Sequence, residues 1–129
     1  MNELFRKLKL KPGSRAAFFH VPADYPLGEL PEGVEVAAQP EPGSCDFVHL
    51  FVSSRMELEE RAPQVLEAVK HAGFLWISYP KKTSKIKTDI HRDAGWDVVK
   101  NAGWEGIALI SVDDTWSAMR FRPSDLIGK

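Results

Sequence analysis

Cysteine is almost absent from this sequence, and so is any long apolar run. The single cysteine, Cys45, excludes an internal disulfide and a zinc cluster built from cysteines. No apolar stretch approaches the ~20 residues that a membrane-spanning helix requires. The first residues, MNELFRKLKLKPG, lack the apolar centre of a signal peptide. These absences predict a cytoplasmic protein that does not associate with a membrane.

A strong net charge of either sign is also lacking. The 129 residues sum to a net charge of −1 at pH 7, which does not favour non-specific binding of nucleic acid by the chain as a whole. Ten acids fall within residues 24–67 and ten basic residues within 68–129, so a polyanion would have to use a local patch. With 43% hydrophobic and 27% charged residues, the composition predicts one globular domain over residues 1–129.

Nucleotide-binding glycine motifs and metal-binding motifs are missing as well. Neither G-x-G-x-x-G nor G-x-x-x-x-G-K-[ST] occurs in the chain. Cys45 and His49 are four residues apart in a predicted strand, so they point to one face about 13 Å apart, too far to share a metal ion. We therefore expect no metal site.

Apolar runs separated by turn residues predict a sheet with intervening helices. Residues 1–14 form a short amphipathic segment. A helix is expected from Ser54, where Glu57 completes a capping box, and Pro63 either kinks this helix or opens a second one. A further helix is expected from about Thr88 to Ala102, with apolar residues at i+4 intervals. The predicted strands are residues 15–21, 33–38, 45–53, 73–78, 106–113 and 115–122.

The alternation of strands and helices predicts the fold class. Two of the strands are apolar throughout, as in a parallel sheet covered on both faces, and right-handed crossovers connect such strands. Residues 106–113 and 115–122 are joined by a short Asp-Asp-Thr turn, which makes them antiparallel neighbours. The expected fold is an α/β, three-layer Rossmann-like sandwich with a mostly parallel sheet and a C-terminal antiparallel hairpin.

Two resemblances rest on these elements. The order of strands and helices resembles the later two-thirds of a class I methyltransferase domain. In addition, PEGVEV, DFVHLFVSSRMELE, WISYPKKTSKIKTDIHRD and VDDTWSAMRF resemble, over nearly the whole chain, a family of small bacterial proteins of unknown function. The methyltransferase resemblance implies the strand order 2-1-3-4-6-5 with the sixth strand antiparallel, and the bacterial family implies no activity.

The chain departs from the methyltransferase pattern where the cofactor binds. Such enzymes carry a glycine-rich loop after the first strand and an acid at the end of the second. This chain has HVPADYP at the first place and Ala38-Gln39-Pro40 at the second. We therefore do not expect S-adenosylmethionine to bind in the usual way, and the sequence points to no other cofactor.

The resemblance also implies where a ligand would bind. In open α/β sheets, ligands bind beyond the carboxyl ends of the strands, where the strand order reverses. The candidate ligand-binding residues follow the first, third and fourth strands. They are His20, Asp24, Ser53, Ser54, Arg55, Lys81, Lys82, Thr83 and Ser84.

Each candidate has a purely structural alternative. Lysines before a predicted helix N-terminus favour an anion, but they also suit a solvated loop. Ser54 is equally explained as a helix cap, and His20 as a structural residue, since the sequence shows no acid, serine or cysteine partner near it. Trp96 is expected to be exposed, on a surface that contacts a partner or a second copy.

Three functions remain open at this point. The first is a binding module that holds a small anionic or nucleotide-like ligand. The second is a structural or protein-interaction domain, with a homo-oligomer or another protein as partner, acting through exposed aromatic residues or the basic N-terminal segment. The third is a divergent methyltransferase. Because no nucleophile or base with an orienting partner is evident, we predict no catalytic residue and favour a non-enzymatic role.

Overall fold

A computed structural model of the chain describes residues 2–127. Residues 1 and 128–129, which belong to the predicted domain of residues 1–129, lie outside the described residues. The elements, in chain order, are α1 (Glu3–Lys7), β1 (Arg15–Phe19), the 3₁₀ turn η1 (Leu27–Glu29), β2 (Glu35–Val36), β3 (Cys45–Phe51), α2 (Arg55–Ala68), β4 (Val69–Pro80), α3 (Asp97–Asn101), β5 (Trp104–Ser111), β6 (Trp116–Pro123) and the 3₁₀ turn η2 (Ser124–Leu126).

All six strands form one sheet in the order β2-β1-β3-β4-β6-β5, as the resemblance implies. The pairs β1–β2, β1–β3 and β3–β4 are parallel, whereas β6 is antiparallel to both of its neighbours. The expected C-terminal hairpin and the antiparallel sixth strand are therefore confirmed. β3 lies inside the sheet and nearly all of it is buried, which explains its continuous apolar sequence.

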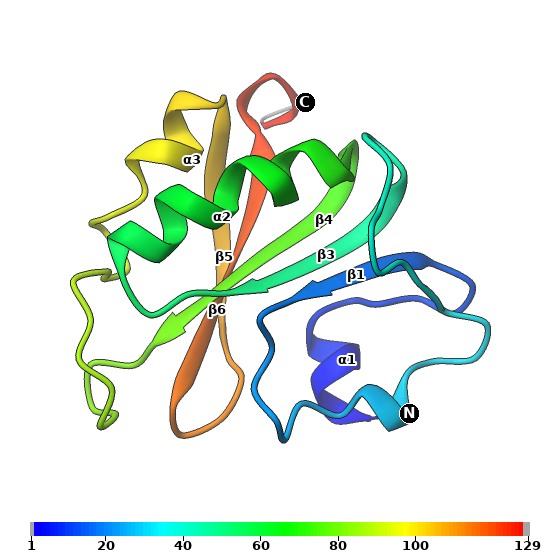
Figure 1. Ribbon diagram of the computed structural model, residues 1–129, viewed down its shortest axis with the longest axis horizontal. Coiled ribbons are helices and arrows are strands. Elements are labelled where there is room, and N and C mark those ends of the chain that lie inside the picture. Colours follow the sequence, from blue (N-terminus) through cyan, green and yellow to red (C-terminus); the bar gives the residue numbers. More distant parts are fainter. Residues whose placement is uncertain (1, 128–129) are drawn as a thin grey trace.

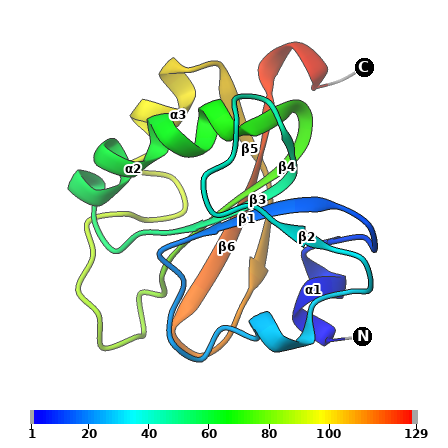
Figure 2. The same ribbon diagram turned by 45° about the vertical axis from the view of Figure 1, so that its right-hand side comes forward.

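Both faces of the sheet are covered, which gives three layers (Figure 1). On one face, α2 and α3 pack over a core that includes Val48, Leu50 and Ile77. On the other face, α1 and residues 20–34 close a second core that includes Phe5 and Trp76. Figure 2 shows α1 beneath the sheet, on the side opposite to α2 and α3. The second layer of cover is thus mostly irregular chain.

α2 begins as the sequence predicts and is one continuous helix. The Ser54 side chain accepts a hydrogen bond from the Glu57 N–H, and the helix runs from Arg55 to Ala68. Pro63 lies inside it, on the exposed side, where the carbonyl that loses its hydrogen bond can turn to water. Pro63 therefore does not open a second helix.

The helix predicted from Thr88 to Ala102 is wrong over most of its length. Only Asp97–Asn101 is helical, and the preceding residues form an irregular loop. Ile90 is fully buried from this loop, and Gly95 has a φ of 102°, which ends any helical path. The i+4 spacing of apolar residues reflects burial from a loop and not a helical face.

Two further expectations are corrected by the packing. Trp96 is only 3% exposed, and its indole N–H donates to the carbonyls of His91 and Arg92, so it offers no exposed aromatic surface. Cys45 and His49 lie on opposite faces of the sheet, because the pairing of β3 with β4 shifts register near Cys45. The predicted common face for these two residues is therefore wrong.

Candidate functional site

Three parallel strands end side by side at one edge of the sheet, and polar residues follow each of them. β1 ends at Phe19, β3 at Phe51 and β4 at Pro80. Beyond these ends the structure has two separate pockets in place of the single crevice that the sequence predicts. We call them the switch-point pocket, between β1 and β3, and the lysine-loop pocket, after β4.

The switch-point pocket has a volume of about 400 Å³. It holds two of the predicted residues, His20 and Ser53, together with Glu57 and Arg61 from α2. His20 has a φ of 57°, a left-handed conformation that non-glycine residues rarely adopt and that ends β1 two residues earlier than predicted. The remaining lining residues of the switch-point pocket are Val21, Phe51, Val52 and Trp116.

Glu57 is the centre of the polar contacts in this pocket. One carboxylate oxygen accepts hydrogen bonds from the Ser53 N–H at 2.8 Å, the Ser53 hydroxyl at 2.9 Å and Arg61 Nη1 at 3.2 Å. The Ser53 N–H, and then its hydroxyl, Arg61 and His20, hold the pKa of Glu57 below its usual value. His20 thus has a carboxylate neighbour that the sequence did not reveal.

Four of the nine predicted residues line neither pocket, and Ser84 of the lysine loop is one of them. Ser54 caps α2, which is the structural role that the sequence offered as an alternative to ligand binding. Arg55 braces the loop before α3, since its N–H donates to the Asp89 carboxylate at 2.8 Å and its Nε to the Asp89 carbonyl at 2.9 Å. Asp24 is exposed beside the buried Tyr25.

The lysine-loop pocket has a volume of about 550 Å³ and contains three of the nine residues predicted from the sequence to bind a ligand. Lys81, Lys82 and Thr83 line it, whereas Ser84 does not: its N–H donates to the Lys81 carbonyl and closes a turn. The remaining lining residues are Tyr79, Pro80, His91, Arg92, Asp93 and Ser117. The pocket therefore gathers three permanent cations, Lys81, Lys82 and Arg92, against one carboxylate.

The two lysines of this pocket are not neutralised by acids. Lys81 Nζ donates to the Ser111 hydroxyl at 2.6 Å, and within residues 2–127 neither Lys81 nor Lys82 forms an ion pair. Arg92 pairs with Asp93 at 3.3 Å. The dipole of a following helix cannot assist them, because α3 starts fourteen residues after Thr83 and has only five residues.

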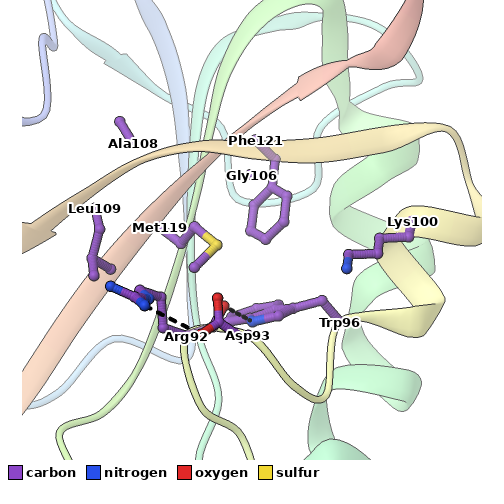
Figure 3. A pocket seen from close by; sticks show the side chains of 9 residues that line it. All are labelled: Arg92, Asp93, Trp96, Lys100, Gly106, Ala108, Leu109, Met119 and Phe121. Atoms are coloured by element: carbon purple, nitrogen blue, oxygen red, sulfur yellow. Dashed lines mark hydrogen bonds and ion pairs between the residues drawn. The ribbon is translucent and has the colours of Figure 1, made fainter.

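A third pocket, of about 400 Å³, adjoins the second and shares Arg92 and Asp93 with it (Figure 3). We call it the Trp96 pocket. Met119 and Phe121 of β6 point toward Trp96 in this view, and Lys100 of α3 lies at one side. Its other lining residues are Gly106, Ala108, Leu109, Met119 and Phe121.

Sequence reasoning missed His91, Arg92 and Asp93, although they follow the lysines in the same stretch. The wrongly extended helix placed them on a helical surface. In the structure an antiparallel bridge between His91 and Ala94 turns the loop back toward β6. The one indication in the sequence was the run of three consecutive polar residues, His91 to Asp93, shortly before Trp96.

A buried polar chain behind the site was also missed. The Tyr25 hydroxyl lies 2.8 Å from His49 Nδ1, and His49 Nε2 lies 2.6 Å from the Ser78 hydroxyl. Burial lowers the pKa of His49 to about 3 and raises the pKa of Tyr25 above its usual value. With all three side chains buried, the chain holds residues 20–34 against β3 and β4 and offers no access to a substrate.

Within residues 2–127, no three histidine, cysteine or acidic side chains are grouped so as to hold a metal ion. None of the described helices is long and apolar enough to cross a membrane.

The sequence matches no protein-family model and no curated protein.

Solved structures with the same fold include a SAM-dependent methyltransferase and a putative transferase. A SAM-dependent methyltransferase from Aquifex aeolicus is 12% identical, with a TM-score of 0.65 over 92% of this chain and 87% of the other. TYW2 from Pyrococcus horikoshii, solved in complex with MeSAdo, is 12% identical, with a TM-score of 0.51 over 93% of this chain. A putative transferase from P. horikoshii is 12% identical, with a TM-score of 0.53 over 93% of this chain.

The chain spans 61% of the length of TYW2 and of the putative transferase. At 12% identity these likenesses show the fold alone. With the strand order β2-β1-β3-β4-β6-β5 and the antiparallel β6, they establish that the chain has a Rossmann-like, methyltransferase-like α/β fold.

Proposed function

We propose that the protein is a binding module that holds a small anionic ligand in the lysine-loop pocket. The observation that carries this proposal is the gathering of Lys81, Lys82 and Arg92 around one pocket, with Asp93 as the sole carboxylate among its lining residues. Three permanent cations against one acid leave the pocket positive at pH 7. A positive concave surface concentrates anions and holds them by charge-assisted hydrogen bonds.

The donors in this pocket suit the oxygens of a phosphate or a similar anion. The lysines supply point charges, and Arg92 supplies a planar fork that fits two oxygens at once. Thr83 and Ser117 add hydroxyl groups to the lining of the pocket. Since the lysines form no ion pair within the described residues, an anion would not have to displace a carboxylate from them.

Thermal melts of the full chain with inorganic phosphate and pyrophosphate test the proposal. An anion at ~100 times its dissociation constant adds about 2.7 kcal/mol to the free energy of unfolding, a shift of several degrees. The double variant Lys81→Ala/Lys82→Ala should lose this shift while its melting temperature without anion stays close to that of the wild type. Lys82 is exposed and Lys81 is half-buried at the surface, and surface substitutions of this kind change stability by less than ~0.5 kcal/mol.

The same loop provides a matched control. Lys85→Ala/Lys87→Ala removes the same total charge, but neither residue lines the pocket. This variant should keep most of the anion-induced shift. If both double variants lose the shift equally, the effect comes from the overall charge of the loop and the proposed site is wrong. If neither anion shifts the wild type, the proposed function is wrong.

Association with a protein partner is the alternative function. The packing changes which surface would mediate this association. Trp96 lies in the core, so the aromatic surface first considered for it is buried, whereas Arg6, Lys7 and Lys9 of the basic N-terminal segment are exposed. The observation that favours association is now the edge strand β5, where Ile107 is 41% and Leu109 43% exposed. Sedimentation of the full chain over a range of concentrations tests for self-association.

A divergent methyltransferase is the third candidate, favoured by the structural neighbours. S-adenosylmethionine would have to lie at the switch point, where the backbone after β1 must approach it closely. His20 lies there in a left-handed backbone conformation and carries a side chain, and the bulky Phe51 and Trp116 line the same pocket. Residues 37–40 after β2 are Ala, Ala, Gln and Pro, so no acid stands directly after this strand, where such enzymes hold the ribose. These residues do not fit the cofactor, and methyl transfer therefore ranks third.

We further propose that residues 1–129 act as one domain in the bacterial cytoplasm. All six strands belong to a single sheet, which supports one folding unit. The single, buried cysteine suits a reducing compartment. Membership of the small bacterial family of unknown function stays a prediction from the sequence, and so does the absence of a cofactor.

A further inference from the structure

The lysine-loop pocket and the Trp96 pocket are two halves of one groove. They have Arg92 and Asp93 in common, so a molecule in one pocket can continue past these residues into the other. Their chemistry differs in part. Cations line the first pocket, whereas the second combines Arg92, Asp93 and Lys100 with an apolar floor of side chains from β6 and the loop before α3. A ligand that filled both would be anionic at one end and apolar at the other.

The Trp96 pocket has the size and the surface for a flat apolar group. Its volume is about 400 Å³, and its floor consists of Trp96, Met119 and Phe121, all of them nearly fully buried. Figure 3 shows Met119 and Phe121 pointing from β6 toward Trp96, with Leu109 beside them. Because the floor is fixed by the core, this shape is preformed and an entering group need not open it.

Gly106 keeps this pocket open on the side of β5. A Cβ atom at this position would lie 2.6 Å from the Met119 sulfur, so any larger residue would push Met119 aside. Gly106 has no positive φ, which means that the absence of a side chain serves space and not backbone conformation. A glycine within a strand marks a place of close approach.

We propose that the anion of the lysine-loop pocket is the phosphate of a ribonucleotide whose base enters the Trp96 pocket. This inference rests on the proposed function and adds the class of ligand. The phosphate contacts Lys81, Lys82 and Arg92, and the base lies against Met119 and Phe121. Burial of the base supplies affinity that inorganic phosphate cannot gain.

Asp93 lies where the ribose of such a ligand would be, between the two pockets. One of its carboxylate oxygens pairs with Arg92 at 3.3 Å, and the side chain is 82% exposed. A carboxylate is a poor neighbour for a phosphate but a good acceptor for the two hydroxyl groups of a ribose. In a site for a bare anion, an acid at this place would only repel the ligand.

Isothermal titration of the full chain with inorganic phosphate, AMP and 2′,3′-dideoxy-AMP tests the inference. AMP should bind at least ~10-fold more tightly than phosphate, because the base buries apolar surface. Leu109→Trp fills the Trp96 pocket from β5 and should abolish this advantage while leaving phosphate affinity unchanged. Ile107→Trp is the matched control: it makes a comparable change at a similarly exposed position of the same strand, outside the pocket.

Asp93→Asn provides a second test, with effects in opposite directions. Loss of the negative charge should tighten phosphate binding, since a repulsive neighbour is removed. The same variant should lose the preference for AMP over 2′,3′-dideoxy-AMP, because the acceptor for the hydroxyl groups is weakened. A structural role for Asp93 would lower both affinities together and would overturn its assignment to the ribose.

The outcomes separate the two proposals. If phosphate binds and AMP binds no more tightly, the nucleotide inference is wrong and the anion-binding function stands. If AMP is favoured but Leu109→Trp and Ile107→Trp behave alike, the base does not enter the Trp96 pocket and the inference is again overturned. If neither phosphate nor AMP binds, both proposals fail.

Discussion

His49 Nδ1 lies 2.8 Å from the hydroxyl oxygen of Tyr25, and both side chains are buried between the sheet and residues 20–34. On its other side, His49 Nε2 lies 2.6 Å from the Ser78 hydroxyl. A neutral imidazole has one donor and one acceptor, so it satisfies both hydroxyl groups at once. The pair thereby ties an irregular loop to the centre of the sheet without leaving a polar atom of His49 unpaired.

Tyr25→Phe should destabilise the protein by about 1–3 kcal/mol, because a buried ring nitrogen of His49 loses its partner. Urea unfolding followed by circular dichroism measures this change. Tyr79→Phe is the control: Tyr79 is also buried, but no hydrogen bond of its hydroxyl is seen within residues 2–127. Equal losses in the two variants would show that the Tyr25–His49 bond adds nothing beyond the packing of the ring.

His49 should also make stability fall with acid. Its pKa is about 3 in the folded protein, below the usual value of 6.5, so between these values the unfolded chain binds a proton that the folded chain does not. This stabilisation is complete above pH 6.5 and declines by up to ~1.4 kcal/mol per pH unit as the pH falls toward 3. Melting temperatures of the wild type and His49→Gln at pH 7.5 and 5.0 measure the effect.

In His49→Gln the decline between these two pH values should be smaller. The other three histidines, His20, His71 and His91, are exposed and are present in both proteins, so their contributions cancel in the comparison. Parallel pH profiles for the two proteins would mean that protonation of His49 does not limit the stability in acid.

Ser54→Ala should cost about 1 kcal/mol of stability, because the Glu57 N–H at the start of α2 loses its acceptor, which lies 3.2 Å away. Ser54→Asp retains an acceptor at the same place and should stay near the wild type. Thermal melts of the three proteins measure the difference. Because Ser54 lines none of the pockets described, phosphate affinity should not change, and a loss of binding in Ser54→Ala would contradict its purely structural role.

Gly95→Ala should destabilise the protein by about 1–3 kcal/mol. Gly95 has a φ of 102°, and a Cβ there would lie 3.2 Å from Arg55 Nε and 3.3 Å from the Ile90 backbone. Gly28→Ala is the matched control, since Gly28 has no positive φ and open space around it. Denaturant midpoints compare the two variants, and a Gly95→Ala protein as stable as Gly28→Ala would rule out strain at this turn.

The sheet could be predicted from the sequence because its signals are local or imposed by parallel pairing. The apolar run of β3 and the Asp-Asp-Thr turn between β5 and β6 each indicate their own structure, and the strand order came with the methyltransferase resemblance. The loop before α3 could not be predicted in this way. Ile90 and Trp96 are buried by tertiary contacts, and their spacing imitates a helix.

The candidate site was predicted in part for the same reason. Lys81 and Lys82 follow a strand whose end the sequence shows, so their place at the sheet edge was predictable. Glu57 was recognised as a capping residue, but its contact with Ser53 and its nearness to His20 depend on how α2 meets the sheet. The Trp96 pocket depends on how the loop before α3 packs against the β5–β6 hairpin, and this packing leaves no local signal in the sequence.

The packing of α1 onto the second face of the sheet determines when this core can form during synthesis on the ribosome. The Trp76 indole N–H donates to the Leu8 carbonyl, 68 residues earlier in the chain, at 2.9 Å. Leu8 and Phe5 share their core with Ala118 of β6. Phe5 and Leu8 are therefore synthesised long before β6, and their apolar side chains stay uncovered until this last strand of the sheet has been made. A nascent chain halted before β6 should consequently be a substrate for chaperones, whereas the released chain should not.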